Sequence, residues 1–220
     1  MTRLLLILSL ALLLATACGG KNVTPTATPL APGGTLSPFT NTRAAALRTG
    51  LNNLLRDHVY LAGIAISAAA NNRADEFQAA AKTLDKNSVA MSKAIEAVYG
   101  AEAGAQFLAG WRSHIGMFIS YTDGLNKGDD AARDKARADL AAYRKSADAF
   151  FSKANPNIPA GLVEQTLAPH VSYLLAVCDA QWSQNHQQTY DQLKAGADQT
   201  QMIGDFLSSA IVKQFHEKFQ

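Results

Sequence analysis

The sequence predicts an all-α fold, an up-and-down helical bundle built from three tandem helical hairpins. From residue 41 onward, apolar residues recur at steps of three and four, which is the period of an amphipathic helix. Proline is confined to three positions in this part of the chain, so long stretches lack helix breakers. His58, His114 and His170 are spaced 56 residues apart, and a fixed period of this size indicates one supersecondary unit repeated in tandem.

The three histidines share one local pattern: a large apolar residue, two variable positions, the histidine and a β-branched residue. Only the histidine is identical in all three segments, which are Leu55–Val59, Trp111–Ile115 and Leu167–Val171. The period indicates three copies of one unit but not how the copies pack. Because the connections are short, we expect six antiparallel helices in one bundle, or a core of four with two appended. A linear solenoid is the alternative.

Residues 1–17 are predicted to be a lipoprotein signal peptide. Arg3 precedes an apolar run, Leu4–Leu14, that is too short to cross a bilayer as a stable anchor, and small residues stand directly before Cys18. This pattern resembles a bacterial lipobox. The resemblance implies cleavage before Cys18, attachment of membrane lipid to its sulfur, and an extracytoplasmic protein anchored to a bacterial membrane. An ordinary secretory signal is the alternative.

Residues 18–41 are predicted to be a flexible tether that begins with the lipidated cysteine. They are rich in glycine, threonine, proline, serine and alanine, and Pro25, Pro29, Pro32 and Pro38 interrupt every possible helix. Almost nothing in this stretch is apolar enough to be buried. We therefore expect no folded element and no chemistry in the tether.

Residues 42–220 are predicted to form the helical bundle domain. The three hairpins are expected at about 42–98, 101–154 and 160–220. The predicted helices are Thr42–Ala70, Ala74–Val98, Ala101–Leu125, Asp129–Ala154, Ala160–Trp182 and Gln184 to the C-terminus. The first of these ends at the turn Asn71-Asn72, and Gly100 and Gly128 occupy the usual position for ending a helix.

The second half of the domain has its own boundary signals. Acidic residues from Asp129 onward begin the fourth helix, where they interact favourably with the helix dipole. The pair Asn155-Pro156 ends that helix, since the residue before a proline avoids the helical conformation. We expect a kink at Pro169 in the fifth helix and an interruption near Gly196 in the sixth.

The composition excludes several classes of function. Without residues 1–17 the chain has 19 basic residues, because Arg3 is lost from the 20, and 18 acidic ones, so its formal charge is near +1. No basic stripe stands out, and we expect no nucleic acid partner. Cys178 is the only cysteine left once Cys18 carries lipid, so no intrachain disulfide is available.

Motifs of catalysis are missing from the sequence. It has no nucleophile elbow, no His-Glu-x-x-His pair, no glycine-rich phosphate loop and no pair of carboxylates in a suggestive setting. Covalent c-type haem is excluded because there is no Cys-x-x-Cys-His segment. We therefore predict a binding protein and not an enzyme.

Each repeated histidine falls on the apolar stripe of its helix and is predicted to face the core. Burying an imidazole without a partner costs roughly 1 to 3 kcal/mol, so each needs a hydrogen bond or a ligand. One explanation is that His58, His114 and His170 each form a hydrogen bond with a partner in the second helix of their own hairpin. The other is that the three meet at a common axis and bind zinc or copper. Haem or another ligand in the bundle is a further alternative.

Other residues are candidates around such a metal site. Met202 is the predicted fourth ligand, with Met91 as a second thioether, and a methionine sulfur would favour copper. Methionine at an apolar helical step is more often part of a core. The predicted neighbours that would support the ligands by packing or hydrogen bonding are Trp111, Tyr121, Tyr143 and Gln201.

Four polar residues near the repeats are predicted to lie outside the site. Asp123 and Asp179 come nine residues after their histidines, which is two and a half helical turns, so both should face away from the histidine stripe. His186 and His216 lack the repeated pattern and are predicted to lie at the surface.

Several stretches carry a resemblance to a known family. They are Leu54–Val59, Leu84–Asn87, Val98–Gly100, Trp111–Ile115 and Ala210–Phe215. In them the chain resembles a loosely defined family of secreted or lipid-anchored bacterial all-helical proteins, functionally uncharacterised, some of which carry the automatic label copper amine oxidase. The resemblance implies a fold and a location but no activity, since true amine oxidases are much larger and mostly β-structured. Relatives carry His-Met where this chain has Gln201-Met202, which implies a fourth imidazole that is missing here.

Together these observations predict a membrane-anchored extracytoplasmic binding protein. Its expected ligand is a copper or zinc ion held by the three repeated histidines, for storage, sequestration or delivery. The alternative is a non-catalytic interaction or structural module of the cell envelope whose histidines only support the core. No protein partner can be named from these residues.

Overall fold

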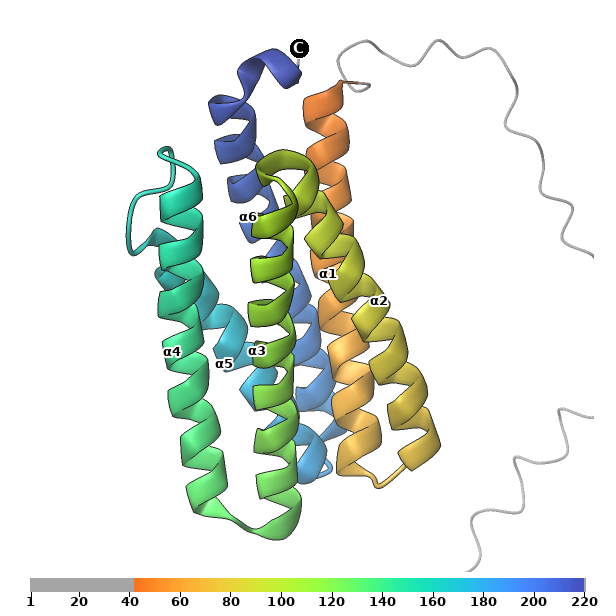
Figure 1. Cartoon of the computed structure of the whole chain (residues 1–220). Coiled ribbons are helices and arrows are strands. Elements are labelled where there is room, and N and C mark those ends of the chain that lie inside the picture. The colour runs from red at the N-terminus through yellow and green to blue at the C-terminus, as the bar shows by residue number, and fades with distance from the viewer. Residues whose placement is uncertain (1–41, 220) are drawn as a thin grey trace, which may run out of the picture. The chain divides into compact units, whose positions relative to one another are not determined.

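Six long helices and one short 3₁₀ helix make up residues 42–219, the part of the chain that the structure, a computed structural model, describes (Figure 1). They are α1 (Arg43–Ala70), α2 (Ala74–Tyr99), α3 (Ala101–Lys127), α4 (Asp130–Ala154), α5 (Leu162–Trp182), α6 (His186–Gln214) and η1 (His216–Lys218). No strand occurs among these residues, so the all-α prediction is confirmed. The predicted helix limits agree with the observed ones to within about two residues except at the end of the last helix, which was predicted to continue to the C-terminus but ends at Gln214 and is followed by η1.

Local chemistry accounts for where the helices begin and end. The Thr42 hydroxyl accepts a hydrogen bond from the Ala45 N–H at 3.0 Å and caps α1. The Asp129 carboxylate accepts one from the Ala132 N–H at 2.9 Å and caps α4. Gly128 ends α3 in the left-handed conformation, with φ of 66°, which glycine adopts without strain.

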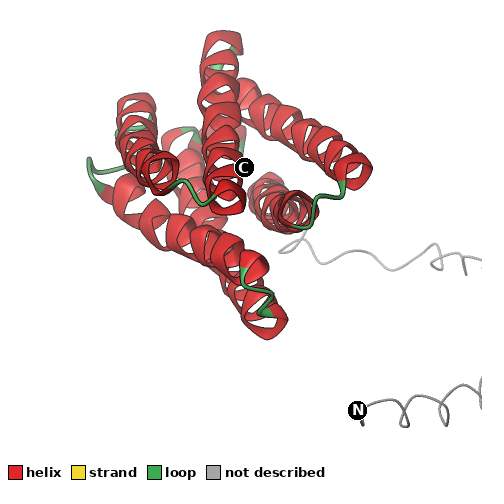
Figure 2. Cartoon of the chain, turned by 90° about the horizontal axis from the view of Figure 1, so that it is seen from below, coloured by secondary structure: helices red, strands yellow, loops and turns green. Residues whose placement is uncertain are grey.

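The helices form a closed ring of three hairpins. Each helix packs along the next in the chain, and α6 returns to pack along α1. Figure 2 shows the helices of the bundle from below. A linear solenoid would leave its first and last helices apart, so the contact between α1 and α6 excludes that alternative. The up-and-down bundle of three tandem hairpins is confirmed.

The first helix of every hairpin lies on the inside of this ring. Besides their neighbours in sequence, α1, α3 and α5 contact one another, whereas α2, α4 and α6 fill the spaces between them. These three inner helices are the ones that carry the repeated histidines. The 56-residue period therefore places equivalent positions of the three hairpins around one axis.

Two expected irregularities do not break the helices. The prediction of an interruption near Gly196 is wrong, because α6 runs through this residue, which packs close to Leu174 of α5. Helix α5 continues as one helix through Pro169. In the turn before this proline, the Thr166 carbonyl accepts a hydrogen bond from Gln199 Nε2 of α6 at 2.7 Å.

The core is divided into two apolar clusters along the bundle. One cluster includes Leu55 and Trp111, and the other includes Val59 and Phe118. The histidines lie between them, since His58 falls between Leu55 and Val59 on α1, and the other hairpins repeat this order. We call this level the histidine layer, consisting of His58, His114 and His170. None of the helices described here is long and apolar enough to cross a membrane.

Candidate metal centre

The histidine layer brings three imidazoles together in the centre of the bundle. Each histidine can offer one ligand atom such that the three atoms all lie within 4.8 Å of one another. The ring of His58 lies 5.3 Å from that of His114 and 6.0 Å from that of His170, measured between centroids. Their exposed fractions are 2%, 2% and 5% for His58, His114 and His170, so the cluster is closed off from solvent.

One ring nitrogen of each imidazole has no polar partner among the described residues. Nδ1 of each histidine is buried without a hydrogen bond, and the nearby indole nitrogen of Trp111 is also unpaired. Four unpaired nitrogen atoms in one place are costly, at roughly 1 to 3 kcal/mol each. Among residues 42–219, no hydrogen bond joins any of these rings to the second helix of its hairpin, so the first of the two explanations for the buried histidines finds no support here.

Burial keeps the three imidazoles neutral. It lowers the pKa of His114 to about 3, with a further contribution from nearby His170, and it lowers the pKa of His170 to about 4. Burial also holds the pKa of His58 well below 6.5, helped by repulsion from the other two rings when they are charged. At neutral pH the nitrogen lone pairs are therefore free of competing protons.

Aromatic rings enclose the histidine layer. Trp111 lies against two of the imidazoles, with its ring 4.6 Å from that of His58 and 4.7 Å from that of His114. Tyr143 of α4 stacks on His114 with 4.7 Å between centroids. Trp111 was predicted from its position three residues before His114, and it does lie beside the cluster.

A small cavity of about 40 Å³ adjoins the layer, and all three histidines line it. Met91 of α2 is buried and lines the same cavity. Thr166 and Thr200 also line it, but their hydroxyls donate to carbonyls of their own helices. Thr166 was not predicted, although its position four residues before His170 puts both on one face of α5.

Two predicted residues of α6 do not reach the histidine layer. Met202 is 68% exposed, so the prediction of Met202 as the fourth ligand is wrong and Met91 is the thioether that faces the cavity. Gln201 donates through Nε2 to the backbone carbonyl of Asn52 at 3.0 Å and joins α6 to α1. Neither side chain contributes a group to the three imidazoles.

Tyr121 lies further along α3, two helical turns beyond His114. Its hydroxyl donates to Asp179 Oδ1 at 2.7 Å and accepts from Arg137 Nη2 at 2.6 Å. Burial and the Asp179 carboxylate raise the pKa of Tyr121 to about 12. Its predicted role as a neighbour of the ligands is therefore wrong, and Asp179, though exposed, has this tyrosine as a partner.

The remaining predicted positions lie elsewhere. His186 and His216 are exposed, as expected, and so is Asp123. Cys18, the predicted site of lipid attachment, lies outside the described residues. Comparison of the chain with protein-family models, with curated proteins and with solved structures found no match.

Proposed function

We propose that this protein binds one copper or zinc ion through His58, His114 and His170. One observation supports the proposal above the rest: three buried, neutral imidazoles present ligand atoms within 4.8 Å of one another, and Nδ1 of each has no hydrogen-bond partner. Imidazole nitrogen is a preferred ligand of both ions. A bound ion would satisfy one nitrogen of each ring and remove much of the cost of burying them.

The geometry fits an ion after a small adjustment. Zinc–nitrogen bonds of about 2.0 to 2.1 Å around one ion place the nitrogens about 3.4 Å apart. Ligand atoms within 4.8 Å of one another therefore need to approach by up to about 1.4 Å. We expect rotation of the side chains to bring them together, with the cavity of about 40 Å³ giving room for it.

Met91 bears on the choice between the two ions. Its side chain is buried and lines the cavity that the histidines share, so it is the candidate fourth ligand. A thioether is a soft donor that suits Cu(I) better than zinc. With Met91 as a ligand the site would prefer copper, and with water in that position it would suit zinc equally well.

The position of the site favours binding of an ion over catalysis. Apolar clusters lie on both sides of the histidine layer, and its rings are at most 5% exposed. We therefore favour storage, sequestration or delivery of the ion over a reaction. The lipobox resemblance at Cys18 adds the proposal that the ion is held outside the cytoplasm by a lipid-anchored protein.

A structural role for the histidines is the second candidate. The stacking of Tyr143 on His114, at an interplanar angle of 15°, favours it, because aromatic packing alone stabilises a buried ring. In that case the protein would be a non-catalytic module of the cell envelope. The imidazoles would then serve as flat core side chains.

Metal content separates the two candidates. We would purify the chain without an affinity tag, titrate it with copper and zinc, and compare it with the triple variant His58→Ala, His114→Ala, His170→Ala. The matched control is the double variant of the exposed histidines, His186→Ala and His216→Ala. Near-stoichiometric metal in the wild type and the control, but not in the triple variant, supports the site. Equal metal in all three, or none in any, refutes it.

Mass spectrometry of the mature protein tests the anchor separately. We expect an N-terminal diacylated Cys18 and retention in the membrane fraction. The Cys18→Ser variant should carry no lipid and leave that fraction. An unmodified Cys18 in the wild type would leave only the secretory alternative.

A further inference from the structure

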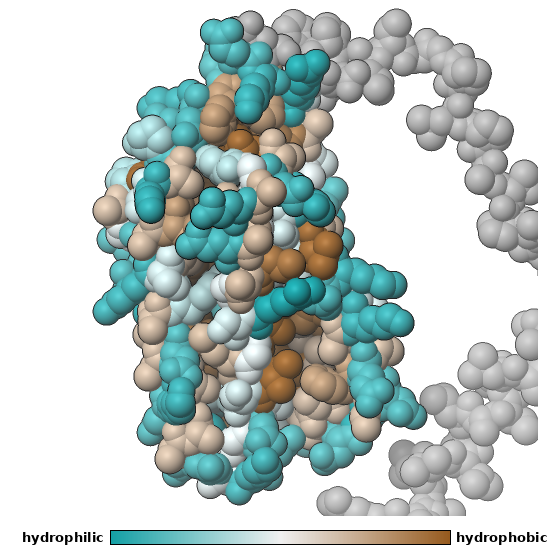
Figure 3. All heavy atoms as spheres, in the orientation of Figure 1, coloured by the Kyte–Doolittle hydropathy of each residue, from teal (hydrophilic) through white to brown (hydrophobic). Residues whose placement is uncertain are grey.

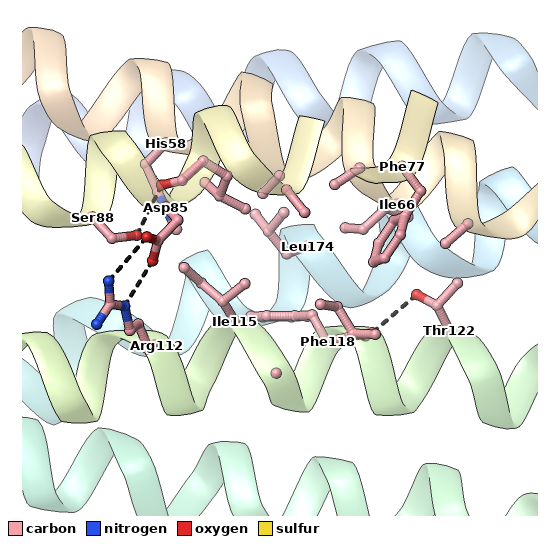
Figure 4. A pocket seen from close by; sticks show the side chains of 17 residues that line it. His58, Ile66, Phe77, Asp85, Ser88, Arg112, Ile115, Phe118, Thr122 and Leu174 are labelled. Atoms are coloured by element: carbon pink, nitrogen blue, oxygen red, sulfur yellow. Dashed lines mark hydrogen bonds and ion pairs between the residues drawn. The ribbon is translucent and has the colours of Figure 1, made fainter. Parts of the chain in front are cut away.

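A second and larger cavity opens between α2 and α3. Its volume is about 220 Å³, and α1 and Leu174 of α5 form its inner wall. Figure 3 shows hydrophobic residues at the surface in a hollow between α2 and α3, the helices that frame this cavity. The lining is mostly aliphatic and aromatic, and Phe77, Ile66, Ile115 and Phe118 are among its labelled members (Figure 4).

Small residues create the empty space. Ala62, Ala65 and Ala69 of α1 face it at steps of three and four, and Ala81 lies opposite on α2. Gly116 of α3 also lines it, and a Cβ added there would meet no atom within 4 Å. Packed protein interiors leave few voids larger than a water molecule. A cavity of this size therefore either holds another molecule or lowers the stability of the fold.

The polar groups of the wall are paired, with one exception. Ser88 and Thr122 donate to the carbonyls of Leu84 and Phe118 in their own helices. His58 is the one lining residue with a buried polar side-chain atom that has no hydrogen-bond partner. It lies at the end of the cavity near Asp85 and Arg112, as Figure 4 shows.

The charged groups at the rim cancel each other. Arg112 Nε donates to Asp85 Oδ1 at 2.7 Å, and Nη2 donates to Oδ2 at 2.9 Å, which ties α3 to α2. No other charged residue lines the cavity. A charged ligand would have to break this bidentate pair or remain unpaired inside, and both are unfavourable.

We propose that this cavity binds a neutral, largely apolar small molecule that carries one hydrogen-bonding group directed at His58. The molecule fills the apolar space between α2 and α3 and pairs its polar group with the imidazole. The neutral ring of His58 has one nitrogen that donates and one that accepts a hydrogen bond. A hydroxyl can donate and accept, so it can pair with whichever nitrogen faces the cavity. The site does not depend on a metal ion in the histidine layer.

The volume sets the size of the occupant. An apolar cavity of about 150 Å³ holds benzene. A cavity of about 220 Å³ therefore takes a molecule of about ten non-hydrogen atoms, which is the size of a naphthol. For such a molecule we expect a dissociation constant of roughly 10 to 100 µM.

Binding of 2-naphthol to the full chain tests the proposal, followed by the fluorescence of the ligand. Naphthalene, which lacks the hydroxyl, should bind roughly 3- to 10-fold more weakly. Naphthalene-2-carboxylate should bind more weakly than either, because its charge has no partner. A carboxylate that binds more tightly than 2-naphthol, or naphthalene that binds equally well, would overturn the role of His58 and the neutral class of ligand.

Filling the cavity provides the matched variants. Gly116→Leu places a side chain in the open space and should weaken binding at least tenfold, whereas Gly50→Leu adds the same side chain to an exposed helical glycine outside the cavity. The control should bind like the wild type, and both should keep the wild-type helical circular dichroism. Equal binding by Gly116→Leu and the wild type would overturn the site, as would no binding to the wild type below about 1 mM.

A second measurement covers the case in which Gly116→Leu does not fold. Methyl NMR of the wild type should show shifts on addition of 2-naphthol for Ile66 and Ile115, which line the cavity. Ile158 and Ile211, which do not line it, should not shift. Shifts confined to the second pair, or no shifts at saturating ligand, would refute the location.

Discussion

The ring of Tyr143 lies nearly parallel to the imidazole of His114, with 4.7 Å between the centroids and 15° between the planes. The tyrosine belongs to an outer helix, α4, and the histidine to an inner one, α3. Through this pair the outer helix covers the side of the histidine layer. The contact combines apolar burial with a stacking interaction of about 0.5 to 1.5 kcal/mol.

Replacing Tyr143 by alanine should therefore destabilise the fold by about 3 kcal/mol. The control is Tyr190→Ala, since Tyr190 is 65% exposed and its loss should cost less than about 0.5 kcal/mol. Urea unfolding, followed by circular dichroism at neutral pH, measures both. Similar values for the two variants would show that the stacked ring contributes nothing of its own.

Stability should fall as the pH falls below 6.5. The pKa of His114 is lowered to about 3 and that of His170 to about 4 in the folded state, while all three histidines of the layer regain ordinary values on unfolding. The unfolded chain thus binds more protons than the folded one between about pH 6.5 and 4, and acid favours unfolding. Together the three groups should lower the free energy of unfolding by about 3 to 4 kcal/mol for each pH unit of acidification in this window.

Urea unfolding at pH 7, 6 and 5 measures this slope in the metal-free protein. In His170→Phe one titrating group is removed, and the slope should drop by about 1.4 kcal/mol per pH unit. An unchanged slope in this variant would assign the acid sensitivity to other groups. A flat profile in the wild type would mean that the imidazoles are not neutral in the core.

The Asp148 carboxylate should contribute more to the stability of the fold than an ordinary helix cap does. It lies in α4 and is buried, and it accepts hydrogen bonds from the N–H groups of Gly161 at 2.8 Å and Val163 at 2.9 Å, where α5 begins. Asp148→Ala leaves these donors unpaired and should cost about 2 to 3 kcal/mol. Asp129→Ala removes an exposed cap and should cost only about 1 kcal/mol. Equal losses of stability in the two variants, measured by thermal unfolding, would show that the burial of Asp148 adds nothing to its hydrogen bonds.

Two glycines of α3 should respond to alanine in opposite directions. A Cβ on Gly104 would lie 2.7 Å from Glu96 Cβ, where α2 and α3 approach closely, so Gly104→Ala should destabilise the protein by about 1 to 3 kcal/mol. Gly116 has open space around its Cβ position, so Gly116→Ala should stabilise by up to about 1 kcal/mol through helix propensity. Melting temperatures should move down and up respectively. A rise for both would mean that the hairpin relaxes at Gly104.

The helices and the histidine layer could be predicted because their signals are local or repeated. Glycine, asparagine and proline mark the helix ends, and a period of 56 residues fixes three equivalent positions at once. Any closed packing of three such hairpins brings equivalent positions near a common axis. Neither inference needs the details of side-chain packing.

Residues of α6 could not be placed in this way, because the rotation of a helix depends on its partners. The buried face of α6 is marked by small and hydroxyl residues, Thr189, Gly196, Thr200 and Gly204, as well as by aliphatic ones. Met202 precedes Ile203 by one residue and so points about 100° away from it. Met202 is more apolar than the small residues beside it, yet those residues and not the methionine identify the buried face.

The ring of hairpins closes where the two ends of the helical region meet. Arg43 Nη1 donates to the Lys218 carbonyl at 3.4 Å, so a short linker could join these ends. New ends could then be opened at Gly100, between the first and second hairpins, to give a circularly permuted chain. Each histidine would still reach the layer from its own hairpin. The central site thus depends on the cyclic order of three units and not on which of them is made first.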